Sequence, residues 1–68
     1  MPSTLISRIA YEPRRKVLSV WFVRSGKRYD YEAVPAATYA GFRQAFSKGR
    51  FFNDHIRGHF RFRLVAEG

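Results

Sequence analysis

Two turn sequences divide the first half of this chain into segments of strand length. The first, Glu12–Arg15, has a proline at the second position of a turn, where its fixed φ is favoured. The second, Ser25-Gly26, offers a glycine for the positive φ that a two-residue hairpin loop needs. Between them, Lys16–Arg24 is rich in β-branched and aromatic residues, which is typical of a strand. The spacing predicts an antiparallel meander of three strands, over residues 5–11, 16–24 and 27–34.

The same turns predict which residues pair across the strands. A two-residue loop pairs Phe22 with Tyr29, and a four-residue loop at the first turn pairs Ile9 with Leu18. One face then carries the residues expected to form the core: Leu5, Ile9, Leu18, Val20, Phe22, Tyr29 and Tyr31. A slip by one residue would expose all of them, which favours this register. The opposite face is mixed and holds Ile6, Arg8, Ala10, Val17, Ser19, Trp21, Val23, Arg28, Asp30 and Glu32.

The pattern becomes helical at Pro35, because proline is favoured in the first turn of a helix. Tyr39, Phe42 and Phe46 recur at the i, i+3 and i+7 positions of one helical stripe. This stripe is expected to pack on the core face of the sheet. Gly49 is suited to end the helix, since glycine is common just after a helix terminus.

A second, shorter helix is predicted by Phe52 and Ile56, which lie four residues apart, and it should stop at Gly58. The alternation in Phe60–Val65 predicts a fourth strand or an extended segment along a sheet edge. The expected fold is therefore α+β. It is a three- to four-stranded antiparallel meander with one main helix and a short second helix packed on one face.

The length of 68 residues is enough for one domain, residues 1–68. A chain this short buries only about 60 % of its unfolded surface, so bulky side chains must fill the core. Seven Phe, four Tyr and one Trp supply them. With no cysteine, no signal-peptide pattern and no apolar run of membrane-spanning length, we expect a cytoplasmic protein without membrane contact.

The charge is the strongest global feature of the sequence. Thirteen Lys and Arg oppose five Asp and Glu, which gives a net charge of +8. Ten of the thirteen are arginine, whose planar guanidinium suits bidentate phosphate contact and stacking. This balance favours a polyanion as partner. A solubility role, or a complex with an acidic protein, would explain the same charge.

Several short motifs together resemble the KTSC domain. The sequence Tyr29-Asp30-Tyr31 supplies the central Tyr-x-Tyr of that family, and Val34-Pro35 follows it. Ile9–Tyr11 stands upstream, and Ala45–Asn53 and Ile56–Gly58 stand downstream. The resemblance covers residues 7–62, nearly the whole chain. It implies a short module found alone in bacterial and phage proteins and at the C-terminus of some lysyl-tRNA synthetases, and that attachment suggests RNA binding.

Trp21 is the candidate platform for stacking a base. It is predicted on the face away from the helices, near Arg8 and Arg28, and a Trp flanked by Arg can hold a base and its phosphate. A homodimer interface, or cover by the C-terminal segment, would account for the same apolar patch. The residues predicted to contact nucleic acid are Arg8, Arg14, Arg15, Lys16, Trp21, Arg28, Arg61 and Arg63.

Two other groups have a simpler structural explanation. Tyr29 and Tyr31 could stack on bases, but the predicted pairing puts them beneath the helix, which favours a role in the core. The cations near Gly49 could bind phosphate, but a solvated helix face explains them equally well. These cations are Lys48, Arg50 and Arg57.

Catalysis and metal binding are not expected. His55 and His59 have a metal-binding spacing, but Gly58 lies between them and there is no cysteine to add a ligand. Nothing in the sequence orders Asp54 and His55 against Ser47 as a catalytic triad, and there is no phosphate-binding glycine loop. We therefore expect no enzyme, no cofactor and no metal.

Two functions remain. The first is nucleic-acid binding, to RNA above all, through the Trp21 face and its flanking arginines. The second is a protein-interaction or self-association module that uses the same surface, with Trp21, Ile6 and Val23 as a homodimer seam.

Overall fold

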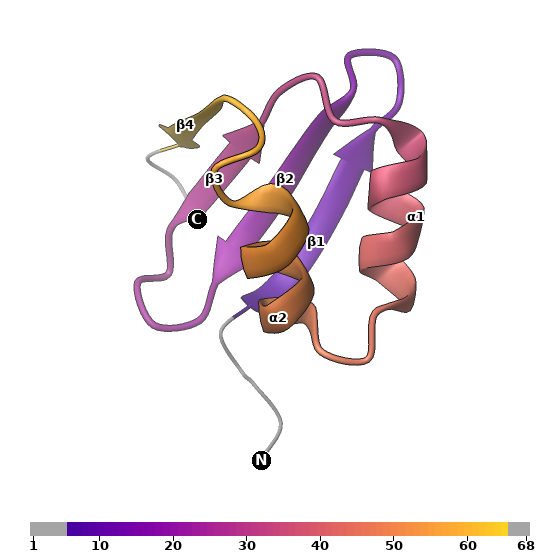
Figure 1. Ribbon diagram of the computed structural model, residues 1–68. Coiled ribbons are helices and arrows are strands. Elements are labelled where there is room, and N and C mark those ends of the chain that lie inside the picture. Colours follow the sequence, from indigo (N-terminus) through magenta and orange to yellow (C-terminus); the bar gives the residue numbers. More distant parts are fainter. Residues whose placement is uncertain (1–5, 66–68) are drawn as a thin grey trace.

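A four-stranded antiparallel sheet forms the frame of the computed structural model, which describes residues 6–65. The strands are β1 (Ile6–Glu12), β2 (Val17–Phe22), β3 (Arg28–Tyr31) and β4 (Phe62–Val65). They lie side by side in sequence order, so β1 and β4 form the two edges (Figure 1). The predicted α+β meander is confirmed, with its last segment as a true fourth strand.

Both helical segments cover the same face of the sheet (Figure 1). They are α1 (Ala36–Gln44), then α2 (Lys48–Phe51), which continues directly into the π-helical turn η1 (Phe52–Ile56). α1 ends earlier than predicted, and α2 begins where the Ser47 hydroxyl accepts a hydrogen bond from the backbone N–H of Arg50 at 3.3 Å. Gly49 consequently lies buried inside α2, and does not end the first helix.

The early end of α1 corrects the place of Phe46. This residue lies in the loop between α1 and α2 and is fully exposed, where the helical stripe had placed it in the core. Phe51, and not Phe46, packs against the helix at this point, with its ring stacked on Phe42 at 5.4 Å between ring centres. Gly41 makes this possible, since a Cβ there would lie 3.2 Å from the Phe51 ring.

The strand pairing differs from the predicted register by two residues in both hairpins. Val20 faces Ile9 on one side and Tyr29 on the other. The first loop is Pro13–Lys16, one residue later than predicted, because Lys16 adopts a left-handed backbone conformation with φ 56°. A shift of two preserves the alternation of faces, so the predicted core face survives the correction.

The second hairpin has a longer loop than Ser25-Gly26. The backbone N–H of Phe22 donates to the carbonyl of Lys27, and that of Gly26 donates to the carbonyl of Phe22, both at 3.0 Å. Val23 is therefore part of the turn and exposed, and does not lie on the sheet face as predicted.

A bulge in β1 changes the face of Ile6. Arg8 pairs with Trp21, whereas Ile6 pairs with Phe22, so one extra residue lies between the two pairs. Ile6 consequently packs against the core, although the prediction placed it on the opposite face. Leu5, which was expected to share that core face, lies outside the described residues.

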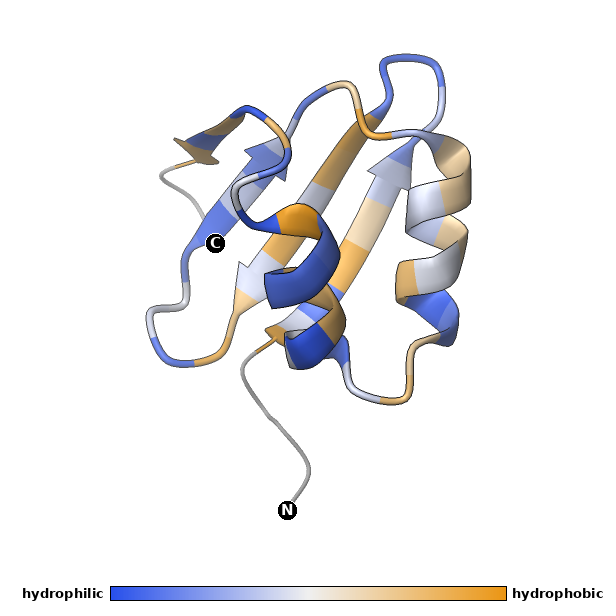
Figure 2. Cartoon of the chain, in the orientation of Figure 1, coloured by the Kyte–Doolittle hydropathy of each residue, from blue (hydrophilic) through white to orange (hydrophobic). Residues whose placement is uncertain are grey.

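The core lies between the sheet and the helical segments. Its buried members are Leu18, Val20, Tyr31, Val34, Phe42, Phe52 and Ile56. α1 is held to β1 by the Tyr11 side chain. Its ring stacks on Tyr39 at 4.7 Å, and its hydroxyl donates to the carbonyl of Val34 at 2.6 Å. Figure 2 shows hydrophobic residues along β1 and β2, and a hydrophilic turn between them.

Two phenylalanines of α1 and its following loop provide a matched test of this core. Phe42→Ala should lower the free energy of unfolding by about 3–5 kcal/mol, because the side chain is fully buried and its removal leaves a cavity. Phe46→Ala, at a fully exposed position, should leave the stability almost unchanged. Denaturant unfolding measures both, and equal losses would contradict this packing.

Candidate nucleic-acid interface

Trp21 lies on the sheet face that the helical segments leave open. It is the central residue of a cross-strand row, with Arg8 of β1 on one side and Arg28 of β3 on the other. The guanidinium carbons lie over the indole, 4.9 Å from the ring centre for Arg8 and 5.2 Å for Arg28. Both distances are within the range of a cation–π contact. The structure thus brings together three of the predicted contact residues.

Arg28 is fixed in place by a polar network on the same face. Its Nε donates to Oδ1 of Asp30 at 2.9 Å, and its Nη2 donates to Oδ2 at 3.3 Å. The Ser19 hydroxyl donates to Oδ1 of Asp30 at 2.8 Å. Asp30 is buried, so this network satisfies a carboxylate that would otherwise be costly to desolvate. It also holds the Arg28 guanidinium in the orientation that contacts Trp21.

The pKa of Asp30 reflects this setting. Burial by itself would raise the pKa of the carboxyl group. Hydrogen bonds from Arg28 and Ser19, and the positive charges of Arg28 and Arg63, act in the opposite direction. Together they outweigh burial and lower the pKa of Asp30 below its ordinary value. The group is therefore ionised throughout the neutral range.

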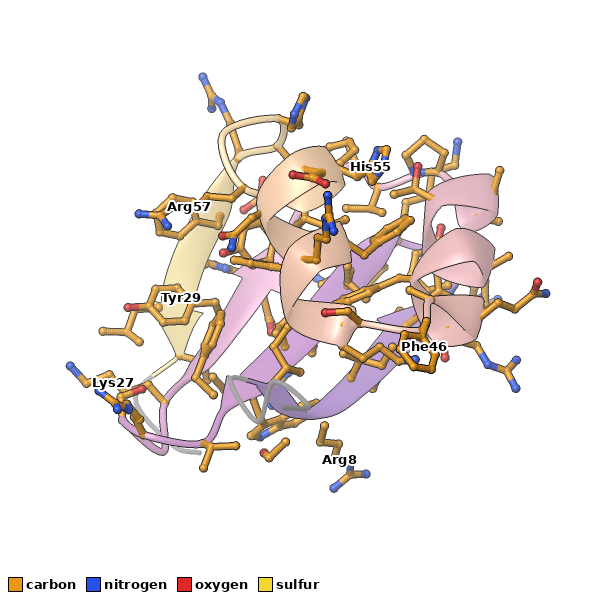
Figure 3. All side chains as sticks on the ribbon, turned by 60° about the horizontal axis from the view of Figure 1, so that its bottom comes forward. Arg8, Lys27, Tyr29, Phe46, His55 and Arg57 are labelled. Atoms are coloured by element: carbon orange, nitrogen blue, oxygen red, sulfur yellow. The ribbon has the colours of Figure 1, made fainter. Side chains whose placement is uncertain are left out.

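Arg8 has a different role from Arg28. No carboxylate of residues 6–65 lies within salt-bridge distance of it. Figure 3 shows its side chain projecting away from the body of the molecule. Arg8 is therefore a cation available to a partner, whereas much of the Arg28 charge is balanced by Asp30.

A hollow next to the network carries both signs of charge. Three carboxylates line it, from Glu12, Asp30 and Glu32. The cations around it are Arg15, Lys16, Arg28 and Arg63. Arg63 lies 3.9 Å from the Glu32 carboxylate, so part of its charge is balanced as well. This part of the open face is less attractive to phosphate than the Arg8 end.

The remaining predicted cations lie apart from Trp21. Arg14 and Arg15 are exposed on the β1–β2 turn, where the backbone N–H of Arg14 donates to the Glu12 carboxylate at 2.7 Å. Arg61 precedes β4 and is exposed, and its backbone carbonyl accepts from the N–H of Glu32 at 2.8 Å. Neither position adds a side chain to the Trp21 row.

Tyr29 and Tyr31 lie on the other face, toward the helical segments. Tyr31 is buried and contacts the rings of Phe52 and Phe62, at 5.5 and 5.4 Å between centres. Burial first, and then the neighbouring Tyr29, raise the pKa of Tyr31 to about 12 against the opposing charge of Arg57. The hydroxyl is therefore uncharged at neutral pH. The predicted place of both tyrosines beneath the helical segments is the one the structure shows.

One concave surface was not found from the sequence. A groove with a volume of about 420 Å³ lies between η1 and the β3–β4 half of the sheet, and both motif tyrosines line it. Arg24 and Arg57 also line it. The Tyr-x-Tyr motif was the available signal, but the groove also depends on where η1 ends and on the pairing of β4, which the sequence does not specify.

The histidines and acids near η1 do not gather into a metal-binding group in the described part of the chain. Residues 6–65 contain no group of three His, Cys, Asp or Glu side chains that could hold a metal ion. His55 packs against the Phe51 ring at 4.4 Å, and the Ser47 hydroxyl is engaged as the α2 cap. Within the same range, no helix is long and apolar enough to cross a membrane.

Comparison with known proteins identifies the family. The family model of the KTSC domain matches residues 2–60. This chain belongs to the KTSC domain family. The crystal structure of a KTSC domain protein from Yersinia pestis has a TM-score of 0.87 and 35 % sequence identity to it. The match covers 97 % of this chain and 94 % of the Yersinia chain, so the two folds agree over almost their full length.

Two curated proteins contain a region similar to this chain, in different settings. A lysine–tRNA ligase of Nostoc punctiforme is 36 % identical over 63 residues, which are 93 % of this chain but only 11 % of the ligase. An uncharacterized protein of Stutzerimonas stutzeri is 35 % identical over 63 residues, with 91 % of this chain and 87 % of that protein covered. The similar region is thus a small part of one long chain and most of a short one.

The Asp30 network predicts an acid dependence of stability. The folded-state pKa is lowered, so the ionised carboxylate stabilises the KTSC fold above its unfolded pKa of about 3.9, and this stabilisation is lost as the pH falls through the folded pKa. Asp30→Asn should lower the free energy of unfolding by about 1–3 kcal/mol at neutral pH. It should also reduce the further loss of stability at acid pH.

Asp54→Asn is the matched control for this variant. Asp54 is exposed and lies 3.9 Å from Arg50 in an i, i+4 pair, so its loss should change stability by less than about 0.5 kcal/mol. Urea unfolding at several pH values measures all three proteins. If Asp30→Asn loses as much stability at acid pH as the unchanged protein does, a group other than Asp30 controls this loss.

Proposed function

We propose that this KTSC domain binds single-stranded nucleic acid, RNA above all, and acts as a binding module and not as an enzyme. The observation that carries the proposal is the Trp21 row, in which an indole on the open sheet face lies between Arg8 and Arg28. Aromatic rings on a sheet face, with arginine beside them, are a common surface for stacking bases and contacting their phosphates.

The geometry suits this task in two ways. The Asp30 network orients Arg28 before any ligand arrives, so less side-chain entropy is lost on binding. Arg8 lies at the outer end of the row, where a phosphate can approach it, and no carboxylate of the described residues 6–65 pairs with it. A base that displaces the Arg8 guanidinium from the indole, or that stacks on the outer side of this guanidinium, would place its own phosphate near Arg8.

The wider charge distribution supports the same class of partner. A net charge of +8 attracts any polyanion, and the exposed Arg14, Arg15 and Lys16 of the first turn would add to this attraction. Arg61 and Arg63 at β4 would add to it in the same way. The likeness to a region of a lysine–tRNA ligase favours RNA among the polyanions.

Self-association is the second candidate, through a different surface from the one predicted. Ile6 faces the core and Val23 lies in a turn, so they do not form an apolar seam with Trp21. The edge strand β4 instead exposes about half of two apolar side chains, 56 % of Phe62 and 50 % of Leu64. An unpaired edge with such residues can pair with another chain.

Substitution of Trp21 is the central test of RNA binding. Trp21→Ala should weaken binding to a short single-stranded RNA by about 1–3 kcal/mol if a base stacks on the indole. The double change Arg14→Ala and Arg15→Ala should cost only an electrostatic increment. With about four phosphates contacted, the logarithm of the binding constant should fall with the logarithm of salt concentration with a slope near −3. Fluorescence anisotropy of labelled RNA measures these quantities.

Circular dichroism should confirm that each variant is folded, and sedimentation should establish whether it is a monomer. Affinity that is untouched by Trp21→Ala, while each arginine change weakens it equally, would mean diffuse charge attraction. A dimer that Leu64→Glu converts into a monomer would support the self-association candidate through β4.

A further inference from the structure

The groove between η1 and the β3–β4 half of the sheet has features of a ligand site that the Trp21 row does not share. Its volume of about 420 Å³ is within the range of about 300–1,000 Å³ that is usual for small-molecule sites. We propose that it binds one nucleotide, with the base among the aromatic rings and the phosphate at an arginine. This inference rests on the proposed function in one respect: the bound nucleotide is taken to be part of a single-stranded nucleic acid.

The walls of the groove are aromatic. They are formed by Phe22, Tyr29, Tyr31, Phe52 and Phe62. Tyr29 lies edge-on to Phe22 at 5.5 Å and tilted to Phe62 at 5.6 Å between ring centres. Phe62 lines the groove and is 56 % exposed, an unfavourable state for an apolar side chain in water. A planar base that covers this ring would bury that surface and gain a stacking contact.

The charges of the groove favour an anion. Arg24 comes from the β2–β3 turn and Arg57 follows η1, and both are exposed. Among residues 6–65, no acidic side chain lines the groove, and none lies within salt-bridge distance of either arginine. Figure 3 shows Arg57 and Tyr29 on the same side of the molecule, beside β4. The hollow on the opposite face, by contrast, carries three carboxylates.

The groove also offers hydrogen-bonding groups. The Asn53 side chain is exposed at the lining and can both donate to and accept from a base edge. Tyr31 also lines the groove, and no hydrogen bond joins its hydroxyl or the Asn53 amide to another residue between 6 and 65. A few polar groups above apolar walls are the usual composition of a site for a small planar ligand.

These features together specify the ligand chemistry. Aromatic walls select a planar ring, the arginines select a negative charge near it, and the amide can read its edge. A base of a single strand can enter such a groove, whereas a base paired and stacked in a duplex cannot. An acidic peptide with an aromatic side chain has similar chemistry but lacks the hydrogen-bonding edge of a base.

The test is a titration of isotope-labelled protein with adenosine 5′-monophosphate, followed by amide chemical shifts. Adenosine, inorganic phosphate and a short Glu-Phe-Glu peptide serve as separate probes. The nucleotide should give saturable shifts at Asn53, Arg57 and Gly58, with weaker binding of adenosine and weaker still of phosphate. Stronger binding of the peptide than of the nucleotide would overturn the assignment, as would shifts with no saturation.

Matched variants make the test specific to the groove. Phe62→Ala, at a half-exposed position, should weaken nucleotide binding about tenfold. Phe46→Ala removes an exposed ring elsewhere and should have no effect. Arg57→Ala should weaken binding more than Arg43→Ala, which removes the same charge from α1. Equal effects within either pair would overturn the proposal.

The two proposed sites can fail separately. Trp21→Ala should leave nucleotide binding in the groove unchanged, because Trp21 lies on the other face of the sheet. If the nucleotide does not bind but RNA affinity still depends on Trp21, the groove assignment is wrong and the RNA function stands. If the nucleotide binds in the groove but Trp21→Ala does not change RNA affinity, the groove assignment stands and the assignment of RNA to the Trp21 row is wrong.

Discussion

The structure depends on one constraint, which is that the helical segments of this chain of 68 residues cover only one face of its sheet. Leu18, Val20 and Tyr31 turn toward the helical segments, and Phe42, Phe52 and Ile56 meet them there. The alternation of side chains along β2 and β3 then requires the other residues to face outward. Everything that the open face carries has to be stable without a second layer above it.

The open face meets this requirement with polar groups that satisfy one another. Ser19, Arg28 and Asp30 form a network in which the buried carboxylate is fully engaged. The same network holds Arg28 against Trp21, so a structural need and a proposed binding surface share their residues. The face toward the helical segments is not covered completely, because β4 extends beyond these segments. Phe62 therefore remains half exposed and becomes a wall of the groove.

The sequence predicted face and element type better than register. Because strand side chains alternate with a period of two, a register error of two residues left the core face intact. In the first hairpin the error arose at Lys16, whose left-handed backbone is rare for a residue other than glycine, asparagine or aspartate and leaves no sequence signal. In the second hairpin it arose from the longer loop that follows Phe22. The bulge that turns Ile6 toward the core also has no recognisable signal in the sequence. Phe46 fitted the helical stripe, but the Ser47 cap begins a new helix at that point.

The candidate site was predictable where it depended on alternation alone. Trp21, Arg8 and Arg28 meet because they share a face of adjacent strands, which the pattern of the strands indicates. The engagement of Arg28 by Asp30 needed side-chain geometry, and the groove needed the placement of η1 and β4 against each other. Both features depend on tertiary packing, which the periodicity of the sequence does not predict.

Photo-crosslinking of the protein to a single-stranded RNA that carries 4-thiouridine tests the central claim most directly, because it reports which residues touch the bases. If RNA lies on the open sheet face, the crosslinked peptide recovered by mass spectrometry should contain Trp21, and excess unlabelled RNA should abolish the crosslink. Crosslinks confined to the basic turn at residues 13–16, or spread evenly over the chain, would contradict an RNA site at Trp21.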